Sequence, residues 1–315
     1  MRKLGAPLTV ETVDLTKTYA DTTVVDRLNL SIEDGEIFGF LGPNGAGKTT
    51  TILMLLGLTE PTSGIARICG HNSTRDPLKV KQLAGYVPEK VGFYDDLTAR
   101  YNLAYTGRLN NLPEETVTKR VEEALDIVGL SEVAGHKVQQ FSKGMKQRLA
   151  IADILVKLPK VAFLDEPTSG IDPEGVKGML NLIANIAKEQ GMTIILSSHQ
   201  LTQVQQICSR VGIISKGKIV AEGALDQLEK EAFGEGRFKV EVQLAEITQT
   251  IFDCIKQIKG VVGVERTGDL LLVSCLEDLR PQIAKVVVDN NGLLTQMKFQ
   301  SYGLEDIYMK YFTEV

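Results

Sequence analysis

The chain has 315 residues and a formal net charge of −5; 43% of its residues are hydrophobic and 24% are charged. These values are typical of a soluble globular protein, and the length favours two domains. Charges of both signs are mixed along the sequence, so no basic stretch indicates nucleic-acid binding. No apolar run approaches the roughly 20 residues that cross a bilayer, and no signal segment follows Met1, so we expect any membrane role to go through a partner.

Cysteine and histidine are too scattered in the sequence to indicate a metal site. None of the four cysteines forms a C-x-x-C pair, and each lies in or beside an apolar segment. We interpret them as buried thiols in a reducing compartment. Of the three histidines, only His199 lies in a context that indicates a function, described below.

Two strands are predicted in the first 35 residues. Residues 8–14 alternate between apolar and polar side chains, and a second apolar series from Val24 to Ile32 ends at the turn Glu33-Asp34-Gly35. Tyr19 lies between them and has two interpretations. Its ring stacks on a nucleotide base, or it is simply an aromatic residue at a strand end.

A glycine-rich loop is the strongest motif in the sequence. The apolar strand Ile37–Leu41 precedes it, and a helix is predicted from about Lys48 to Leu56. Glycines allow successive backbone N–H groups to point at one anion, and the positive end of the helix dipole faces the same point. Lys48 can reach the β- and γ-phosphates of a nucleotide, and the Thr49 hydroxyl can bind Mg²⁺. The predicted nucleotide-binding residues are Gly42, Pro43, Asn44, Gly45, Ala46, Gly47, Lys48, Thr49 and Thr50.

Residues 98–158 are predicted to be almost wholly helical. Helices are expected from Thr98 to Leu109, from Pro113 to Gly129, and after Ser142, which we predict to be an N-cap. A stretch of roughly 60 residues is too long for a simple crossover helix between two strands, so we interpret it as a separate helical lobe.

A buried strand at Val161–Leu164 ends in two acids. Open α/β sheets bind their ligands at the carboxyl ends of such strands. Asp165 can hold Mg²⁺ directly or through water, and Glu166 is placed to polarise a water molecule aimed at the γ-phosphate. Without the phosphate-binding loop upstream, two solvated acids before Pro167 would be the simpler interpretation.

The strand–helix alternation continues after these acids. A helix is predicted from Pro173 to about Glu189, then a buried strand at Thr193–Leu196, a short helix capped by Ser198, and a hairpin over residues 211–221. This alternation predicts an α/β fold with a mainly parallel sheet and right-handed crossovers.

From residue 224 onward, the predicted order of strands and helices is different. A charged linker helix is predicted for residues 224–236, broken by Gly234-Glu235-Gly236. Residues 237–315 have the order β-α-β-β-α-β plus one helix, which is the ferredoxin-like arrangement of an α+β domain. This segment shows no catalytic constellation, and we hypothesise that it stabilises a dimer or has a regulatory role.

Six motifs in this order resemble those of ATP-binding-cassette (ABC) ATPases, over residues of about 8–222. The resemblance implies a P-loop NTPase domain at residues 1–223 with a helical subdomain at about 90–158. The segments and their counterparts are Tyr19 (adenine-stacking residue), Gly42–Thr49 (Walker A), Phe141–Met145 (signature motif), Val161–Glu166 (Walker B), Ser169–Asp172 (D-loop) and Ser198-His199 (switch histidine).

The resemblance also implies roles that spacing alone does not show. ATP and Mg²⁺ are the expected cofactors, and two copies are expected to pack head to tail around two ATP molecules. Ser142 and Gly144, at a helix N-terminus, would contact the γ-phosphate of the ATP bound to the other copy. His199 would hydrogen-bond the γ-phosphate and orient the water that Glu166 activates, which makes these two the expected catalytic residues.

Two departures from the family pattern stand out. The signature segment reads Phe-Ser-Lys-Gly-Met where the family usually has Leu-Ser-Gly-Gly-Gln, and this variant resembles the single-cassette subunits of drug and antibiotic exporters. Glu89 stands where a glutamine is usual, in Gly85-Tyr86-Val87-Pro88-Glu89. A carboxylate there is a further candidate ligand for Mg²⁺, beside Thr49 and Asp165.

We therefore expect the ATPase subunit of an ABC exporter, at the cytoplasmic face of the cell membrane, held there by a separate permease. The permease is expected to dock near residues 89–96, between the two lobes. One alternative is a cassette ATPase that acts on DNA or ribosomes. Such proteins usually carry long coiled-coil insertions or two cassettes, whereas this sequence shows no heptad runs and no second P-loop. Another is a subunit that binds nucleotide without hydrolysing it, and Glu166 and His199 argue against that.

Overall fold

The computed structural model describes residues 8–233, 238–301 and 304–313. The chain divides into two compact units, Met1–Glu222 (unit 1) and Gly223–Val315 (unit 2), so the division falls beside the predicted boundary at 223. Residues 234–237, which include the predicted Gly234-Glu235-Gly236 break, lie outside the described residues.

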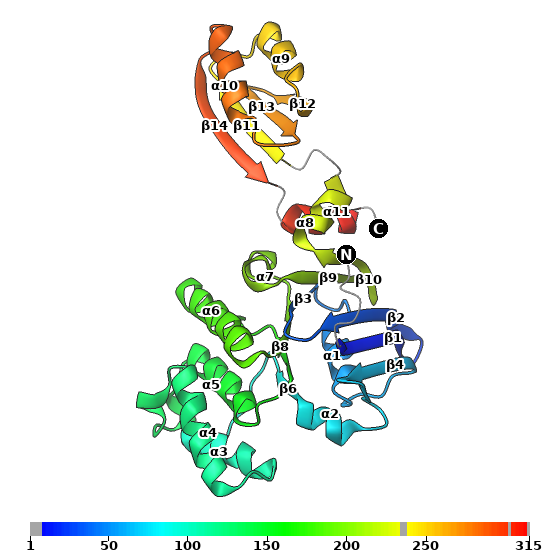
Figure 1. Ribbon diagram of the computed structural model, residues 1–315, viewed down its shortest axis with the longest axis vertical. Coiled ribbons are helices and arrows are strands. Elements are labelled where there is room, and N and C mark those ends of the chain that lie inside the picture. The colour runs from blue at the N-terminus through cyan, green and yellow to red at the C-terminus, as the bar shows by residue number, and fades with distance from the viewer. Residues whose placement is uncertain (1–7, 234–237, 302–303, 314–315) are drawn as a thin grey trace. The chain divides into compact units, whose positions relative to one another are not determined.

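A six-stranded sheet is the centre of unit 1 (Figure 1). Its strand order is β10-β9-β3-β8-β7-β6, and β6, β7, β8, β3 and β9 pair in parallel. The predicted mainly parallel sheet is therefore confirmed. The strands are β3 (Ile37–Leu41), β6 (Ala84–Val87), β7 (Val161–Asp165), β8 (Thr193–Ser198), β9 (Arg210–Ser215) and β10 (Lys218–Ala224).

A second, antiparallel sheet in unit 1 has the order β2-β1-β4-β5. Its strands are β1 (Leu8–Tyr19), β2 (Thr22–Glu33), β4 (Ser63–Ile68) and β5 (His71–Asn72). The first strand is five residues longer than the alternating pattern at 8–14 predicts and ends at Tyr19. Register shifts against β2 explain the difference, because bulges interrupt the strict alternation of side chains.

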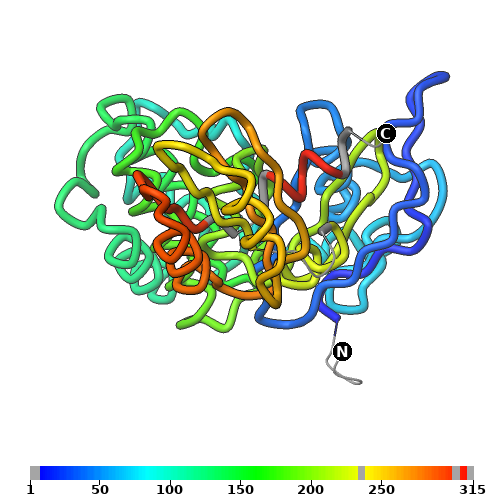
Figure 2. The backbone as a smooth tube through the Cα atoms, turned by 90° about the horizontal axis from the view of Figure 1, so that it is seen from above, coloured from blue at the N-terminus to red at the C-terminus, as the bar shows by residue number. Residues whose placement is uncertain are grey.

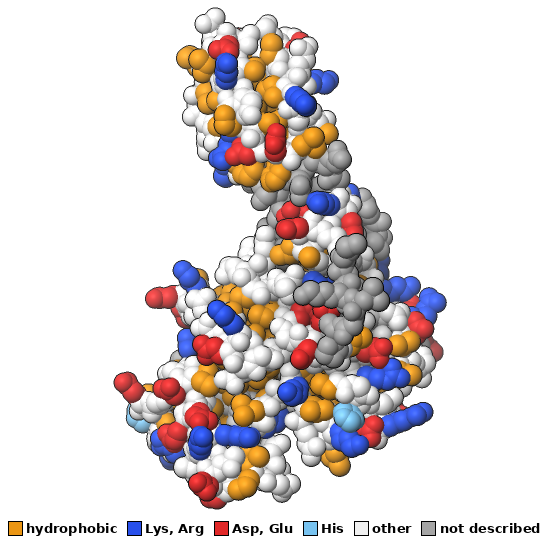
Figure 3. Space-filling model, viewed as in Figure 1, with side chains coloured by type: hydrophobic (Ala, Val, Ile, Leu, Met, Phe, Trp, Pro, Cys, Tyr) orange, Lys and Arg blue, Asp and Glu red, His pale blue; other side chains and the backbone are white. Residues whose placement is uncertain are grey.

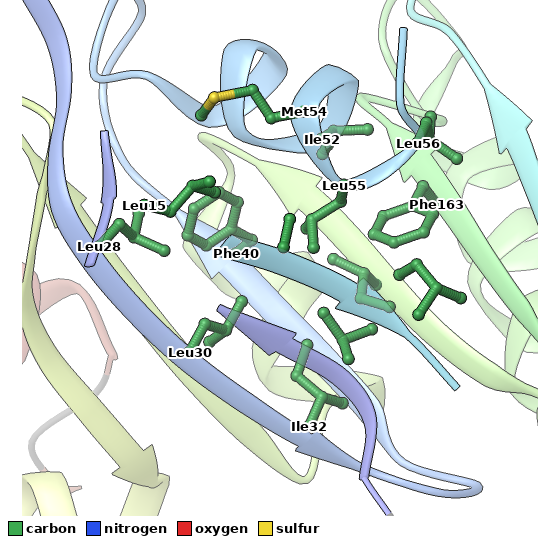
Figure 4. Packing of buried hydrophobic residues seen from close by; sticks show 14 of the residues in the cluster. Leu15, Leu28, Leu30, Ile32, Phe40, Ile52, Met54, Leu55, Leu56 and Phe163 are labelled. Carbon is green, nitrogen blue, oxygen red and sulfur yellow. The ribbon is translucent and has the colours of Figure 1, made fainter. Parts of the chain in front are cut away.

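Helix α1 (Lys48–Leu55) shares one apolar core with both sheets of unit 1. Figure 4 shows Leu55 of α1 lying between Phe40 of β3 and Phe163 of β7, with Leu30 and Ile32 of β2 below. These side chains are almost completely buried. The core fixes both ends of the glycine-rich loop, because the loop joins β3 directly to α1.

Helices α3, α4 and α5 form the predicted helical lobe, gathered at one side of unit 1 in Figures 1 and 2. They span α3 (Ala99–Leu109), α4 (Glu114–Ile127) and α5 (Lys143–Val156), and α2 (Pro77–Leu83) lies before them in the chain. The Ser142 cap is confirmed, because its hydroxyl accepts a hydrogen bond from the Met145 N–H at 3.2 Å.

Two more helices follow strands of the central sheet. Helix α6 (Pro173–Gln190) begins at an Asp172 cap and ends at Gly191, close to the predicted range. Helix α7 (Leu201–Ile207) begins later than predicted. The predicted Ser198 cap is wrong: Gln200 is the N-cap residue, and the Ser198 hydroxyl, three residues before the first residue of the helix, accepts from the Gln200 N–H at 2.9 Å.

Unit 2 contains a four-stranded antiparallel sheet of order β12-β13-β11-β14 with α9 and α10 packed on it. Its apolar core is separate from that of unit 1. Helix α8, in the predicted linker, packs against α11 and is therefore not a free connection. The elements are α8 (Leu225–Phe233), β11 (Phe238–Leu244), α9 (Gln249–Lys256), β12 (Val261–Thr267), β13 (Leu270–Cys275), α10 (Arg280–Asp289), β14 (Leu294–Ser301) and α11 (Leu304–Thr313).

The helices and the charged surface residues bear on whether the chain crosses a membrane. Among the described residues, no helix combines the length and the apolar character needed to cross a bilayer. On the face shown in Figure 3, basic and acidic side chains are interspersed.

Candidate active site

The glycine-rich loop connects the buried strand β3 to α1 and turns back on itself. The Ala46 N–H donates to the Pro43 carbonyl at 3.2 Å, and Gly47 is the N-cap of α1 with φ of 108°. A Cβ at Gly47 would lie 2.7 Å from the Val24 carbonyl oxygen, so only glycine fits. The predicted residues Gly42, Pro43, Asn44 and Gly45 occupy the loop, and Thr49 and Thr50 the first turn of α1. Such a loop at a helix N-terminus is an anion site.

Lys48 lies across the inside of this loop. Its ammonium donates to the Gly42 carbonyl at 2.6 Å and to the Pro43 carbonyl at 3.2 Å, and the residue is buried. Burial lowers the pKa of Lys48, while the carboxylates of Glu166, Asp165 and Glu89 act in the opposite direction. Both acceptors are uncharged carbonyl oxygens. An anionic ligand would bind the Lys48 ammonium more strongly than these carbonyl groups do.

Asp165 and Thr49 meet beside the loop. The Thr49 hydroxyl donates to Asp165 Oδ2 at 2.8 Å, and the Ser197 hydroxyl donates to the other carboxylate oxygen. Asp165 is the last residue of β7 and Ser197 pairs with it in β8. A hydroxyl and a carboxylate side by side are oxygen ligands of the kind that Mg²⁺ prefers, so the residues fit that ion.

Glu166 and His199 are in direct contact. His199 Nδ1 lies 2.8 Å from Glu166 Oε1, and the Glu166 N–H donates to the Ser197 carbonyl at 3.1 Å. The second carboxylate oxygen of Glu166, Oε2, is buried and has no hydrogen-bond partner within the described protein. The His199 side chain is 47% exposed, against 9% for Glu166. The pair therefore presents a carboxylate with one unused oxygen, which can accept a proton from a water molecule.

The remaining predicted site residues make no hydrogen bond to this cluster within the described part of the chain. Tyr19 is exposed at the end of β1, with the Lys17 ammonium 4.9 Å from its ring centroid. Ser142 and Gly144 lie at the start of α5, and none of the hydrogen bonds between described residues links them to the glycine-rich loop. Glu89 is exposed and, within the described chain, makes no hydrogen bond to Thr49 or Asp165.

Sequence reasoning missed three buried polar residues behind the cluster: Ser197, Thr168 and Gln203. Ser197 holds Asp165, and the Thr168 hydroxyl donates to Gln203 Oε1 at 2.5 Å. One signal was available for Ser197, since it directly follows the predicted buried strand Thr193–Leu196 and the carboxyl ends of parallel strands meet at one edge of the sheet. Nothing in the sequence indicates the contact between Thr168 and Gln203, which are 35 positions apart.

Comparisons with known proteins agree with this geometry. A family profile described as "ABC transporter" matches residues 25–169. The bacitracin transport ATP-binding protein BcrA of Bacillus licheniformis is 38% identical over 311 residues, covering 96% of this chain and 96% of that protein. The linearmycin resistance ATP-binding protein LnrL of Bacillus subtilis (strain 168) is 40% identical over 215 residues, covering 68% of this chain and 69% of that protein.

Solved structures are similar as well. An ATP-binding subunit of an ABC transporter matches with a TM-score of 0.66 and 30% identity, covering 72% of this chain and 95% of its own. A dimeric ATP-binding cassette in a post-hydrolysis state, bound to ADP and Pi, matches with a TM-score of 0.63 and 26% identity, covering 69% and 98%. The resemblance derived from the motifs is thus confirmed, and the chain belongs to the ATP-binding subunits of ABC transporters, with their α/β P-loop fold and ATPase activity.

Proposed function

We propose that the chain binds MgATP at the glycine-rich loop and hydrolyses it with Glu166 and His199. The observation that carries this proposal is the cluster in which Lys48, Asp165 and Glu166 converge on the end of β7. The loop amides and Lys48 hold the phosphates, and Tyr19 stacks on the adenine. Thr49 and Asp165 hold Mg²⁺, with Glu89 as a further candidate ligand; the ion neutralises charge on the phosphate oxygens when bound.

Glu166 acts as the general base for the attacking water. Its unused oxygen Oε2 accepts the proton, and His199 keeps the carboxylate oriented through Oε1. The His199 side chain is 47% exposed, and in its doubly protonated form it can donate one N–H to Glu166 Oε1 and the other to a γ-phosphate oxygen. Glu166 then acts on the attacking water, and His199 acts on the phosphate that this water attacks.

A second copy completes the site. Ser142 and Gly144 lie at the N-terminus of a 14-residue helix and, among the described residues, make no hydrogen bond to the glycine-rich loop, which supports their use on ATP held by the other copy. The similar cassette bound to ADP and Pi is dimeric. Each ATP is then enclosed between the loop of one protomer and the Ser142 helix of its partner.

We assign the chain to an exporter of the drug or antibiotic type that works through a separate permease. Relatives carry the names of bacitracin transport and linearmycin resistance proteins. Unit 1 offers a docking surface of two adjacent hollows, of about 210 and 390 Å³, which share Thr106 and Asp153. Tyr94, Tyr105 and Leu109 line the larger hollow and are exposed, so they suit an apolar cytoplasmic segment of the permease.

The substitution Glu166→Gln tests the catalytic assignment. It keeps shape and buried position but removes the base, so we expect ATP-dependent dimerisation to persist while phosphate release slows roughly 10²–10⁴-fold, about 3–5 kcal/mol in the barrier. Phosphate release and light scattering with and without MgATP measure the two effects. Glu174→Gln, at an exposed position of α6, is the matched control. Unchanged turnover in Glu166→Gln would remove Glu166 from the mechanism.

A further inference from the structure

The turn that carries His199 is weakly held by its backbone. His199 lies between the end of β8 and the start of α7, and about half of its side chain is exposed, while its Nδ1 contacts Glu166. The first backbone hydrogen bonds of α7 are long: the Gln203 and Val204 N–H groups lie 3.3 and 3.5 Å from the Gln200 carbonyl oxygen. Such bonds are near the limit of useful geometry, so other contacts must fix the turn.

Side chains supply those contacts. Gln203 is 8% exposed; its amide oxygen accepts from the Thr168 hydroxyl, and its amide nitrogen donates to Gln200 Oε1. The Gln200 N–H donates to the Ser198 hydroxyl at 2.9 Å. Ser198 and Gln200 are the two chain neighbours of His199, so the backbone on both sides of the histidine belongs to this network.

Thr168 connects this network to Glu166, the hydrogen-bond partner of His199. It lies two residues after Glu166 and is 3% exposed. The Ser169 N–H donates to the Glu166 carbonyl at 3.0 Å, and the Ile171 N–H donates to the Thr168 carbonyl at 3.2 Å, so this segment is a defined turn. The contacts therefore close a ring that runs from Glu166 through Thr168, Gln203 and Gln200 to His199, and back to Glu166.

We propose that Gln203 is a positioning residue for the ATPase reaction, which holds His199 against Glu166 through the buried bridge to Thr168. The inference rests on the proposed roles of Glu166 and His199. A glutamine suits the bridge because its amide accepts from one side and donates to the other. Both of its polar atoms are engaged, and leaving either Thr168 or Gln200 unpaired in this buried place carries a free-energy cost. Gln203 acts on the reaction only through the histidine.

The test is the substitution Gln203→Leu, alone and combined with His199→Ala. Misplacing a reactive group by about 1 Å costs up to about 10²-fold in rate, and we expect kcat to fall about tenfold with the KM for ATP unchanged. In the His199→Ala background, Gln203→Leu should lower kcat no further. Gln205→Leu, an exposed glutamine on the same helix, is the matched control and should leave kcat unchanged.

A second pair of variants covers the case in which Gln203→Leu does not fold. Thr168→Val removes the donor with little change of shape, and Thr168→Ser retains it; only the valine variant should lower kcat. Equal kcat losses with and without His199, or no loss in either Gln203→Leu or Thr168→Val, would overturn the inference.

A measurement without nucleotide separates this inference from the proposed function. The chain has only three histidines, so their ring signals can be resolved by NMR. The signal that is missing in His199→Ala is that of His199. We expect Gln203→Leu or Thr168→Val to move the His199 signal, and Gln205→Leu to leave it in place. If His199→Ala hydrolyses ATP normally, the proposed role of the histidine fails, while an unmoved signal in the bridge variants contradicts the positioning role itself.

Discussion

At the scale of single residues, Glu166 has a backbone conformation that carries a cost. Its φ is 51°, in the left-handed region, although it is not a glycine. Such a conformation costs on the order of 1 kcal/mol or more, and it persists where the surroundings over-determine it. Here it carries the carboxylate from the end of β7 onto His199, 33 positions away in the chain. The strain agrees with a functional use of this residue.

Asp153 is a half-buried acid, and its charge can be tested at the same scale. It lines both hollows of the docking surface, and burial raises the pKa of its carboxyl above 3.8, although a hydrogen bond from Thr106 and the charge of Lys157 oppose this. When the pKa of an acid is higher in the folded than in the unfolded state, the protein loses stability as the pH rises from the unfolded-state pKa through the folded-state pKa. Asp153→Asn should therefore raise the melting temperature of unit 1 at pH 7–8 by about 2–4 °C, which corresponds to about 1 kcal/mol.

The pH dependence distinguishes this cause from a packing change. Below about pH 4 the carboxyl is protonated in both states, so the gain from Asp153→Asn should disappear there. Thermal unfolding of both proteins from about pH 3 to pH 8 measures this dependence. Asp126→Asn, at an exposed position of α4, serves as the control. A gain of equal size at every pH would assign the effect to packing.

At the scale of elements, helix α8 depends on α11. Leu228 and Ala232 of α8 and Ile307 of α11 are buried, and the Lys310 ammonium donates to the Ala232 carbonyl. Fully burying a leucine side chain contributes about 1.5–3 kcal/mol. The linker interpretation from sequence missed this pairing, because at least 71 positions separate the two helices (225–233 and 304–313) and the local pattern of one does not indicate the position of the other.

Two shortened chains test this pairing. A chain that ends at Phe233 keeps α8 without α11 and exposes Leu228 and Ala232, so we expect lower soluble yield and binding of an apolar dye. A chain that ends at Ala224 removes both helices but keeps every residue of the candidate active site, and should still hydrolyse ATP. Equal behaviour of the two chains would show that α8 does not need its partner.

The chain ending at Ala224 also tests the role of residues 237–315. If this segment stabilises a dimer, ATP-dependent dimerisation of the shortened chain should be weaker than that of the full chain. If both dimerisation and the regulation of ATPase activity are untouched, the hypothesis is discarded.

At the scale of the whole molecule, the proposed docking surface predicts a membrane partner. A photo-crosslinking amino acid at Tyr105, which is 38% exposed in the larger hollow, should capture a cytoplasmic segment of an integral membrane protein in native membranes. Glu123, exposed on α4, is the control position and should capture much less of it. Mass spectrometry of the crosslinked peptide identifies the partner. Ribosomal protein or nucleic acid at Tyr105 would instead favour the cassette ATPases that act on those targets.

The sequence by itself determined the parts of this protein that depend on near neighbours. The strand–loop–helix at residues 37–55, the buried strand before Asp165 and the Ser142 cap follow from local hydrophobic pattern, glycine freedom and capping, which act over a few residues. The family followed from the order of those motifs. Local signals failed where bulges disturb the alternation, as in β1, and where a serine binds a backbone amide without starting a helix, as at Ser198.

Only the tertiary structure decided how the active site is assembled. The pairing of β7 with β8 puts Asp165 opposite Ser197, and with it brings Glu166 to His199 and Thr168 to Gln203. These contacts span 32 to 35 positions and depend on which strands become neighbours and in which register. Strand order is set by the packing of the whole core. The sequence near any one of these residues therefore does not indicate which distant residue it will contact.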